Sequence, residues 1–249
     1  MKFSIAIPAR LKSSRLPGKV LANLGGKPVL KHVFDMALRV KGIEEVIVLT
    51  ESMDVVDVVK SWGGICHLTP ESCTNGTERI CSAIDLFQGD FILNIQSDEP
   101  FLGAELVHAM IAWAQIHEEF DILTPVYAIR DTSDIFNVNV VKVVLAHDER
   151  ALYFSRSPIP HVRGMDTQQW LSNAPFFGHN GIYLYRRKVL ENLKKLPQSS
   201  LAGAESLEQL RFLQAGYGIQ TILTDRASVA IDTPEDLARA RELIHTIRT

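Results

Sequence analysis

The sequence has few cysteines and no long hydrophobic run. Its three cysteines, Cys66, Cys73 and Cys81, are spaced seven and eight residues apart, which matches neither a disulfide framework nor a C-x-x-C zinc site. The apolar stretch at the start of the chain is short and is broken by Pro8, so it suits neither a signal peptide nor a membrane span. We therefore expect a cytoplasmic protein with reduced thiols and no membrane partner.

The sequence also lacks an excess of either charge. Its 26 basic and 29 acidic residues give a net charge of -3, so nothing suggests a nucleic acid partner. Hydrophobic residues make up 46% of the 249 positions, enough for one large core or for one core with a small appended lobe. An anionic substrate would have to be bound by local rather than overall charge.

The first half alternates short β-rich runs with amphipathic runs, which is typical of βαβ units. The pattern predicts strands at 3–7, 45–50, 65–68 and 91–95, and helices at 29–40, at 53–62 and from Thr77. Such units build a mostly parallel sheet with helices on both sides, and its ligands bind beyond the carboxyl ends of the strands. The loops at 8–19, 69–77 and 96–101 belong to that edge.

After about residue 120 the pattern becomes richer in β-structure. We expect strands at 122–129, 140–145, 151–155, 181–185 and 219–223, helices at 186–193 and 204–215, and a projecting polar arm at 163–175. A last helix should start at Pro234, with Thr233 as its cap and Asp236 in its first turn.

The loop at 8–19 reads P-A-R-L-K-S-S-R-L-P-G-K and concentrates four cations and two serines after the first strand. Cations, hydroxyl donors and a glycine are what a triphosphate site needs. The loop is neither G-x-G-x-x-G nor a P-loop, which argues against a Rossmann oxidoreductase and a P-loop enzyme. A solvated surface turn is the alternative.

The segment N-I-Q-S-D-E-P at 94–100 follows the strand at 91–95 and places two adjacent acids at the sheet edge. A hard carboxylate ligand such as Asp98 suits Mg²⁺, which takes one or two protein carboxylates and completes its shell with phosphate and water. The alternative is a turn whose acids cap the following helix.

These two segments belong to a set of seven motifs between Ile5 and Asp236. The others include T-N-G-T-E-R at 74–79, A-L-Y-F-S-R-S-P-I-P at 151–160, H-N-G-I-Y at 179–183, L-E-Q-L-R at 207–211 and I-D-T-P-E-D at 231–236. In kind and in order they resemble the sugar-nucleotide pyrophosphorylase superfamily. Within it they resemble the CMP-sugar-acid synthetases, especially the 3-deoxy-manno-octulosonate (Kdo) cytidylyltransferases.

The resemblance implies roles for particular residues. The residues implied to bind CTP are Ala9, Arg10, Ser13, Arg15, Lys19, Gly76 and Arg79. The implied catalytic residues are Arg10, Lys19, Asp98 and Asp232, of which the two aspartates would hold Mg²⁺ as the cofactor. The residues implied to bind the sugar are Gln96, Arg156, His179, Tyr183, Glu208 and Gln209.

Structural roles remain open for several of these residues. Arg156 could form an internal salt bridge, His179 could be structural, and the T-N-G-T-E-R run could merely cap a helix at Thr77. Glu205, Glu208 and Arg211 have the spacing of a surface ion-pair helix.

Three positions depart from the family pattern. Ser97 stands where glycine is normal, Asn180 where an apolar residue is usual, and Ala202 where glutamate is common. If position 97 had a positive φ, serine would cost roughly 1 to 2 kcal/mol. These changes leave open an 8-amino-Kdo or nonulosonic acid substrate.

The expected protein is a single α/β domain over residues 1–249, Rossmann-like and similar to the nucleotide-diphospho-sugar transferases. Its three layers would contain a mixed, mostly parallel sheet and a small β-rich projecting region. Residues 1–120 would bind the nucleotide, and 121–249 the sugar and a second subunit in a homodimer. The expected activity joins CTP and Kdo to give CMP-Kdo and pyrophosphate for lipopolysaccharide biosynthesis. A noncatalytic nucleotide-binding regulator is the alternative from another class.

Overall fold

The computed structural model describes residues 1–13, 15–117, 119–225 and 227–247. The chain divides into two compact units, Met1–Gln115 with Ser228–Thr249 and Ile116–Ala227. This division differs from the expected halves 1–120 and 121–249 in two respects, because the first boundary falls after Gln115 and the last helix belongs to the first unit. That the whole chain is one domain stays a prediction.

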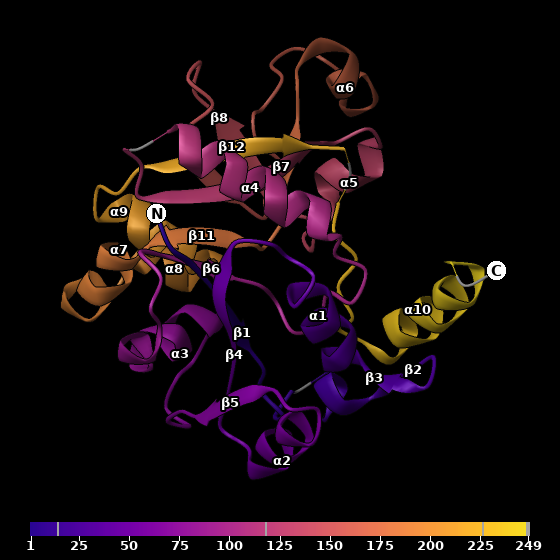
Figure 1. The fold of residues 1–249 in the computed structure, drawn as a ribbon. Helices are drawn as coiled ribbons and strands as arrows, with labels where there is room; N and C mark the ends of the chain where they lie inside the picture. The colour runs from indigo at the N-terminus through magenta and orange to yellow at the C-terminus, as the bar shows by residue number, and fades with distance from the viewer. Residues whose placement is uncertain (14, 118, 226, 248–249) are drawn as a thin grey trace. The chain divides into compact units, whose positions relative to one another are not determined.

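Four parallel strands form the sheet of the first unit (Figure 1). Their order across the sheet is β5 (Ile65–Leu68), β4 (Ile43–Thr50), β1 (Phe3–Pro8) and β6 (Phe91–Asn94). β1 and β6 are buried along their whole length, as expected of central strands that are covered on both faces. Because the strands are parallel, the loops after β1, β4, β5 and β6 all leave the same edge.

Helices connect these strands as βαβ units require. The helices of the first unit are α1 (Val29–Ala37), α2 (Met53–Ser61), α3 (Gly76–Ser82), α4 (Ala104–Ile116) and α10 (Pro234–Ile247). Shorter elements are the 3-10 turns η1 (Lys19–Leu21) and η2 (Ile84–Leu86) and the hairpin of β2 (Asn23–Leu24) and β3 (Lys27–Pro28). None of the described helices is long and apolar enough to cross a membrane.

The last helix, α10, packs in the first unit through its apolar face. Leu237, Ala240 and Ile244 share a buried cluster with Leu24 and Val29. Thr233 and Asp236 cap the helix reciprocally, since Thr233 N–H donates to Asp236 Oδ2 at 3.0 Å and Asp236 N–H donates to Thr233 Oγ1 at 3.2 Å. The predicted start of this helix is confirmed.

The second unit is a mixed sheet built around β7 (Ile122–Ala128). The other strands are β8 (Lys142–Leu145), β9 (Ala151–Ser155), β10 (Phe177–His179), β11 (Tyr183–Arg186) and β12 (Ile219–Thr224). β12 runs parallel to β7, whereas β10 and β11 are antiparallel to it and β8 pairs with β9 and β10. The expected fold class, α/β with a mixed, mostly parallel sheet, is confirmed.

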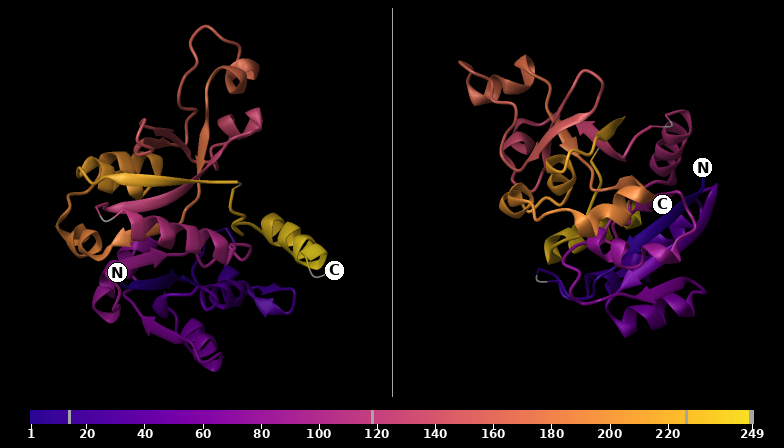
Figure 2. Two further views of the ribbon diagram at one scale, coloured as in Figure 1. Left: turned by 45° about the horizontal axis from the view of Figure 1, so that its top comes forward. Right: turned by 90° about the vertical axis from the view of Figure 1, so that its left-hand side faces the viewer.

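The short helices of the second unit are α5 (Thr132–Phe136), α6 (Trp170–Asn173), α7 (Arg187–Asn192), α8 (Ser200–Glu205) and α9 (Gln209–Gln214), with 3-10 turns η3 (Thr167–Gln169) and η4 (Leu193–Lys195). Figure 2 shows the segment between β9 and β10 extending beyond the strands of its own unit. Its α6 is anchored by Trp170, which packs with Phe176 and Ile135.

The single helix predicted at 204–215 is wrong. Ser206 has φ 51° and ψ 47°, a left-handed conformation that ends α8, and α9 begins only at Gln209. Glu205, Glu208 and Arg211 therefore do not share one helical face. Arg211 instead donates to the backbone carbonyls of Leu193, Leu196 and Pro197.

Candidate active site

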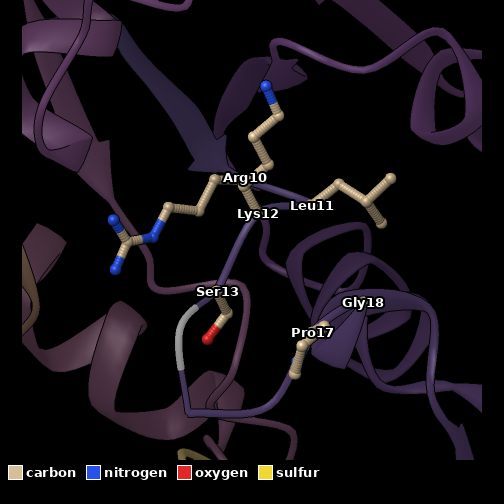
Figure 3. Close-up of a pocket in the computed structure, with 6 residues that line it drawn as sticks. All are labelled: Arg10, Leu11, Lys12, Ser13, Pro17 and Gly18. Carbon is tan, nitrogen blue, oxygen red and sulfur yellow. The ribbon is translucent and has the colours of Figure 1, made fainter.

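The basic loop at 8–19 leaves β1 at the carboxyl edge of the first sheet and lines a pocket of about 710 Å³ (Figure 3). Ala9 is buried and its N–H donates to Leu49 O at 2.8 Å, which fixes the start of the loop. Gly18 N–H donates to Leu11 O at 3.1 Å and closes it. Gly18 has φ +70°, a backbone conformation that favours glycine.

The side chains of this loop are mostly accessible. Arg10, Lys12 and Arg15 are exposed and Ser13 is partly exposed. Figure 3 shows Arg10 and Lys12 extending from the loop in different directions. Exposed guanidinium, ammonium and hydroxyl groups around one pocket form a site for a polyanion.

Lys19 is the buried cation of the loop, and it joins two carboxylates. Its Nζ donates to Asp98 Oδ2 and, at 2.8 Å, to Asp232 Oδ1. Burial alone would lower the pKa of Lys19, but the charges and hydrogen bonds of Asp98 and Asp232 outweigh it and raise the pKa. Arg15 Nη2 adds a contact of 2.9 Å to Asp232 Oδ2.

Asp98 and Asp232 fit the expected Mg²⁺ site. Both carboxylates converge on one cationic group, and their hard oxygen atoms are the ligands that Mg²⁺ prefers. The cap of α10 is supplied by Thr233 and Asp236, so the Asp232 carboxylate is not needed at the start of that helix. The identity of the metal ligands stays a prediction.

Ser97 and Glu99 flank Asp98, and both are buried. Among the described residues only Glu149 and Ser206 have positive φ without being glycine, so the strain considered for Ser97 does not arise. Burial, with the neighbouring charges of Asp98 and Asp232, raises the pKa of Glu99 to about 8. Gln96, the expected sugar contact of this segment, is partly exposed.

The helix α3 begins at Gly76 and is capped by Asn75, whose Oδ1 accepts from Glu78 N–H at 2.8 Å. The cap proposed at Thr77 is therefore wrong. Gly76 packs closely on the end of β1, because a Cβ there would lie 3.1 Å from Pro8 Cγ. Arg79 is buried, with Nη2 3.1 Å from Glu51 Oε2 and Nη1 donating to Thr69 Oγ1.

The second unit contains five of the residues expected to contact the sugar. Arg156 donates to the carbonyl oxygens of Glu205 at 2.8 Å, Val138 at 2.9 Å and Ser206 at 3.4 Å. Within the described part of the chain, the Arg156 guanidinium does not form the internal salt bridge that was considered for it: the carboxylate of Glu205 accepts from Ser155 Oγ and from the backbone N–H of Arg156. The guanidinium charge is thus held by neutral carbonyls.

His179 lies on β10 and its Nε2 is 2.8 Å from Thr124 Oγ1. Burial lowers the pKa of His179 to about 3, so its ring is neutral at ordinary pH. Its ring packs against Phe154 and the buried Tyr183. Gln209 is buried at the start of α9, next to the partly buried Glu208.

Asn180 is buried and donates to Thr224 Oγ1 at 3.3 Å. A polar side chain at this position is thus satisfied within the second unit. Ala202 lies in α8, where its N–H donates to the Ser199 cap at 2.9 Å.

The sequence profile of the cytidylyltransferase family matches residues 5–222. The chain belongs to this family. A 3-deoxy-manno-octulosonate cytidylyltransferase of Parabacteroides distasonis is 40% identical over 245 residues, which cover 96% of this chain and 97% of the relative. An 8-amino-3,8-dideoxy-manno-octulosonate cytidylyltransferase of Shewanella pealeana is 38% identical, with 95% and 96% covered.

A solved structure of this cytidylyltransferase family superimposes closely on the chain. It is a CMP:2-keto-3-deoxy-manno-octonic acid synthetase complexed with CTP, 37% identical, with a TM-score of 0.93 over 99% of this chain and 100% of that chain. The family resemblance drawn from the motifs is therefore confirmed.

Glu51 is a candidate functional residue of this cytidylyltransferase that none of the motifs indicated. Its Oε1 accepts from the N–H groups of Leu11 at 2.9 Å and Lys12 at 3.3 Å, so it holds the basic loop. The position of Glu51 was nevertheless a signal in the sequence. Glu51 directly follows β4, and Asp98 lies in the segment that follows β6. An acid at the carboxyl end of a parallel strand is a candidate for the ligand site.

Proposed function

We propose that the protein transfers the cytidylyl group of CTP to Kdo, giving CMP-Kdo and pyrophosphate. The anomeric hydroxyl oxygen of the sugar forms the new bond to the α-phosphorus and loses its proton. The bond from that phosphorus to the bridging oxygen of the β-phosphate breaks, and pyrophosphate leaves. The observation that carries this proposal is the exposed basic loop beside two converging aspartates, on a chain of the cytidylyltransferase family.

The residues of the first unit supply the electrostatic part of this reaction. Arg10, Ser13 and Arg15 on the loop would bind phosphate oxygens, and Lys19 would offset charge on the leaving pyrophosphate. Asp98 and Asp232 would hold Mg²⁺, which supplies charge neutralisation and orientation of the phosphates when it is bound. Ala9 and Gly76 contribute close backbone approach rather than side chains.

The residues of the second unit are proposed to bind the sugar acid. The Arg156 guanidinium carries a charge that its three carbonyl partners do not neutralise, which suits a carboxylate. His179 is neutral because its pKa is low, so it would contact a hydroxyl rather than the carboxylate. Glu208 and Gln209 would add hydroxyl contacts.

A second candidate substrate is the 8-amino analogue of Kdo. This candidate is favoured by the relative from Shewanella pealeana, which is 38% identical to this chain and is named as a cytidylyltransferase of that amino sugar. The homodimer, the cytoplasmic location and the role in lipopolysaccharide biosynthesis remain predictions. Analytical ultracentrifugation tests the first of them.

The test is pyrophosphate release from CTP and Mg²⁺ with Kdo, 8-amino-Kdo or N-acetylneuraminate as acceptor. We expect release with Kdo, and we expect Asp98→Asn to abolish it. A preference for 8-amino-Kdo would assign the second substrate. If no pyrophosphate is released with any of the three acceptors, in a protein that still binds CTP, the proposal is contradicted. That result would favour a noncatalytic nucleotide-binding regulator.

A further inference from the structure

One buried carboxylate joins three segments at the carboxyl edge of the first sheet. Glu51 directly follows β4, and its Oε1 accepts from Leu11 N–H at 2.9 Å and Lys12 N–H at 3.3 Å in the basic loop. Its Oε2 lies 3.1 Å from Nη2 of Arg79 on α3. The basic loop, the end of β4 and α3 therefore meet at this side chain.

Arg79 extends the connection to the loop after β5. Its Nη1 donates to Thr69 Oγ1, and that hydroxyl donates to Thr50 O at 3.0 Å. Thr69 N–H also donates to Thr50 O, at 2.8 Å. The guanidinium is thus held on one side by a carboxylate and on the other by a hydroxyl that is itself fixed to β4.

The burial of this pair distinguishes Arg79 from the exposed cations of the basic loop. Only 5% of the Arg79 side chain and 6% of the Glu51 side chain are exposed. Buried charges are retained when they are paired, and removing one partner leaves the other uncompensated. Arg10 and Lys12, in contrast, are exposed around the pocket and can meet a ligand directly.

Leu11 is the residue through which the pair acts on the loop. Its N–H is bound by Glu51, and its carbonyl accepts from Gly18 N–H at 3.1 Å, so both sides of its backbone are fixed. Arg10 and Lys12 flank it, and their directions depend on its backbone. A carboxylate at this point also offsets the mutual repulsion of the loop's cations.

We propose that Glu51 is a positioning residue for CTP, holding the basic loop in the conformation that binds the phosphates. Arg79 acts by holding Glu51 in place and does not itself contact the nucleotide. This inference rests on the proposed function only in naming CTP as the ligand. The loop conformation itself can be measured on the free protein.

The experiment compares Glu51→Gln, Glu51→Ala, Arg79→Met and the double variant Glu51→Ala/Arg79→Met with the wild-type protein. Glutamine keeps an acceptor for the loop amides but removes the charge opposite Arg79, whereas alanine removes both. We expect the KM for CTP to rise roughly 10-fold in Glu51→Gln and about 100-fold in Glu51→Ala, since hydrogen bonds to charged groups are strong. The KM for the sugar acid should change by less than about threefold.

The chain offers a matched control in Glu45 on the same strand, β4. Its Oε1 accepts from Ser4 Oγ and from Gln88 N–H at 3.0 Å, so it also ties neighbouring segments together. It lies near the start of β4, whereas Glu51 follows its end. We expect Glu45→Gln to lower the melting temperature without raising the KM for CTP.

The double variant decides whether Arg79 touches the nucleotide. If Arg79 acts through Glu51, the two substitutions disrupt the same interaction. The double variant should then bind CTP no more weakly than Glu51→Ala. If Arg79 contacts CTP directly, its loss would weaken binding further in the Glu51→Ala background, and the proposal would be overturned. Calorimetric titration with CTP gives these affinities without turnover.

Amide hydrogen exchange separates this inference from the proposed function. In the free protein, Glu51→Ala should speed the exchange of the Leu11 and Lys12 amides, while Glu51→Gln should retain part of their protection. Unchanged exchange in Glu51→Ala would overturn the inference even in an active enzyme. If the wild-type protein failed to release pyrophosphate, the proposed function would be contradicted instead. The hydrogen-exchange test of the loop conformation would not be affected.

Discussion

Lys19 Nζ lies 2.8 Å from Asp232 Oδ1, although the two residues stand near opposite ends of the chain. The contact forms because η1 follows the basic loop while α10 returns to pack on Leu24 and Val29. Asp98, at the carboxyl edge of the sheet, meets the same ammonium. The Lys19 amine thus lies where the two carboxylates proposed to hold Mg²⁺ converge.

We predict that Lys19→Met lowers the rate of pyrophosphate release by roughly 100-fold or more, because it removes a buried cation from the loop that we propose binds the phosphates. In the same variant, without nucleotide, Mg²⁺ should raise the melting temperature more than it does in the wild-type protein. The reason is that Asp98 and Asp232 then lack the ammonium that offsets their repulsion. Steady-state kinetics and thermal unfolding with and without Mg²⁺ measure the two effects.

Lys27→Met is the control for this prediction. Lys27 also pairs with a carboxylate, Asp35 at 2.9 Å, but its side chain is about half exposed and lies outside the site. Its loss should change neither the turnover nor the response to Mg²⁺. An equal Mg²⁺ response in Lys19→Met and the wild-type protein would show that Lys19 does not occupy the metal position.

Periodicity predicted much of the fold because many of the strands are short β-rich runs that alternate with amphipathic helical runs. β5 at Ile65–Leu68 and β9 at Ala151–Ser155 have the predicted bounds. β10 was missed since it has only three residues, one of them Gly178. Glycine is required there, because a Cβ would lie 2.3 Å from the Tyr127 ring, and no local pattern reveals that contact.

The motifs indicated the candidate site residues but not the partners of those residues. Arg79 was expected to face the ligand, and its engagement by Glu51 and Thr69 depends on three segments that are brought together only in the folded chain. For Arg156 the sequence left open a ligand contact or an internal salt bridge. Its three carbonyl partners come from segments up to 50 residues away. Long-range contacts of this kind leave no periodic signal.

We predict that Ser206→Gly stabilises the protein by about 1 kcal/mol, because a left-handed conformation is unfavourable for a residue with a Cβ. Ser206 ends α8 at φ 51°, and its carbonyl, which accepts from Arg156, is retained in the variant. Ala204→Gly within α8 is the control and should cost roughly 0.5 to 1 kcal/mol. Urea denaturation measures both changes, and destabilisation by Ser206→Gly would contradict the prediction.

We predict that iodoacetamide labels Cys73 first in the native protein. Cys66 and Cys81 are buried, and burial raises the pKa of the Cys66 thiol to about 11, which keeps it from forming the reactive thiolate. Cys73 is partly exposed in the loop before α3. Mass spectrometry of labelled peptides follows the order, and in urea all three should react. Labelling of native Cys66 as fast as Cys73 would count against the burial seen here.

The pKa of His179 makes stability depend on pH. Because burial lowers this pKa to about 3, the unfolded chain binds a proton near the ordinary pKa of 6.5 while the folded protein does not. The contribution of His179 to the free energy of unfolding is therefore fully present above pH 6.5, and it is lost as the pH falls toward 3, with a slope of up to ~1.4 kcal/mol per pH unit.

His179→Gln keeps a hydrogen-bonding group beside Thr124 but cannot titrate. Urea denaturation at pH 7.5 and pH 5 should show a smaller loss of stability in His179→Gln than in the wild-type protein, and equal losses would mean that His179 is protonated in the folded state.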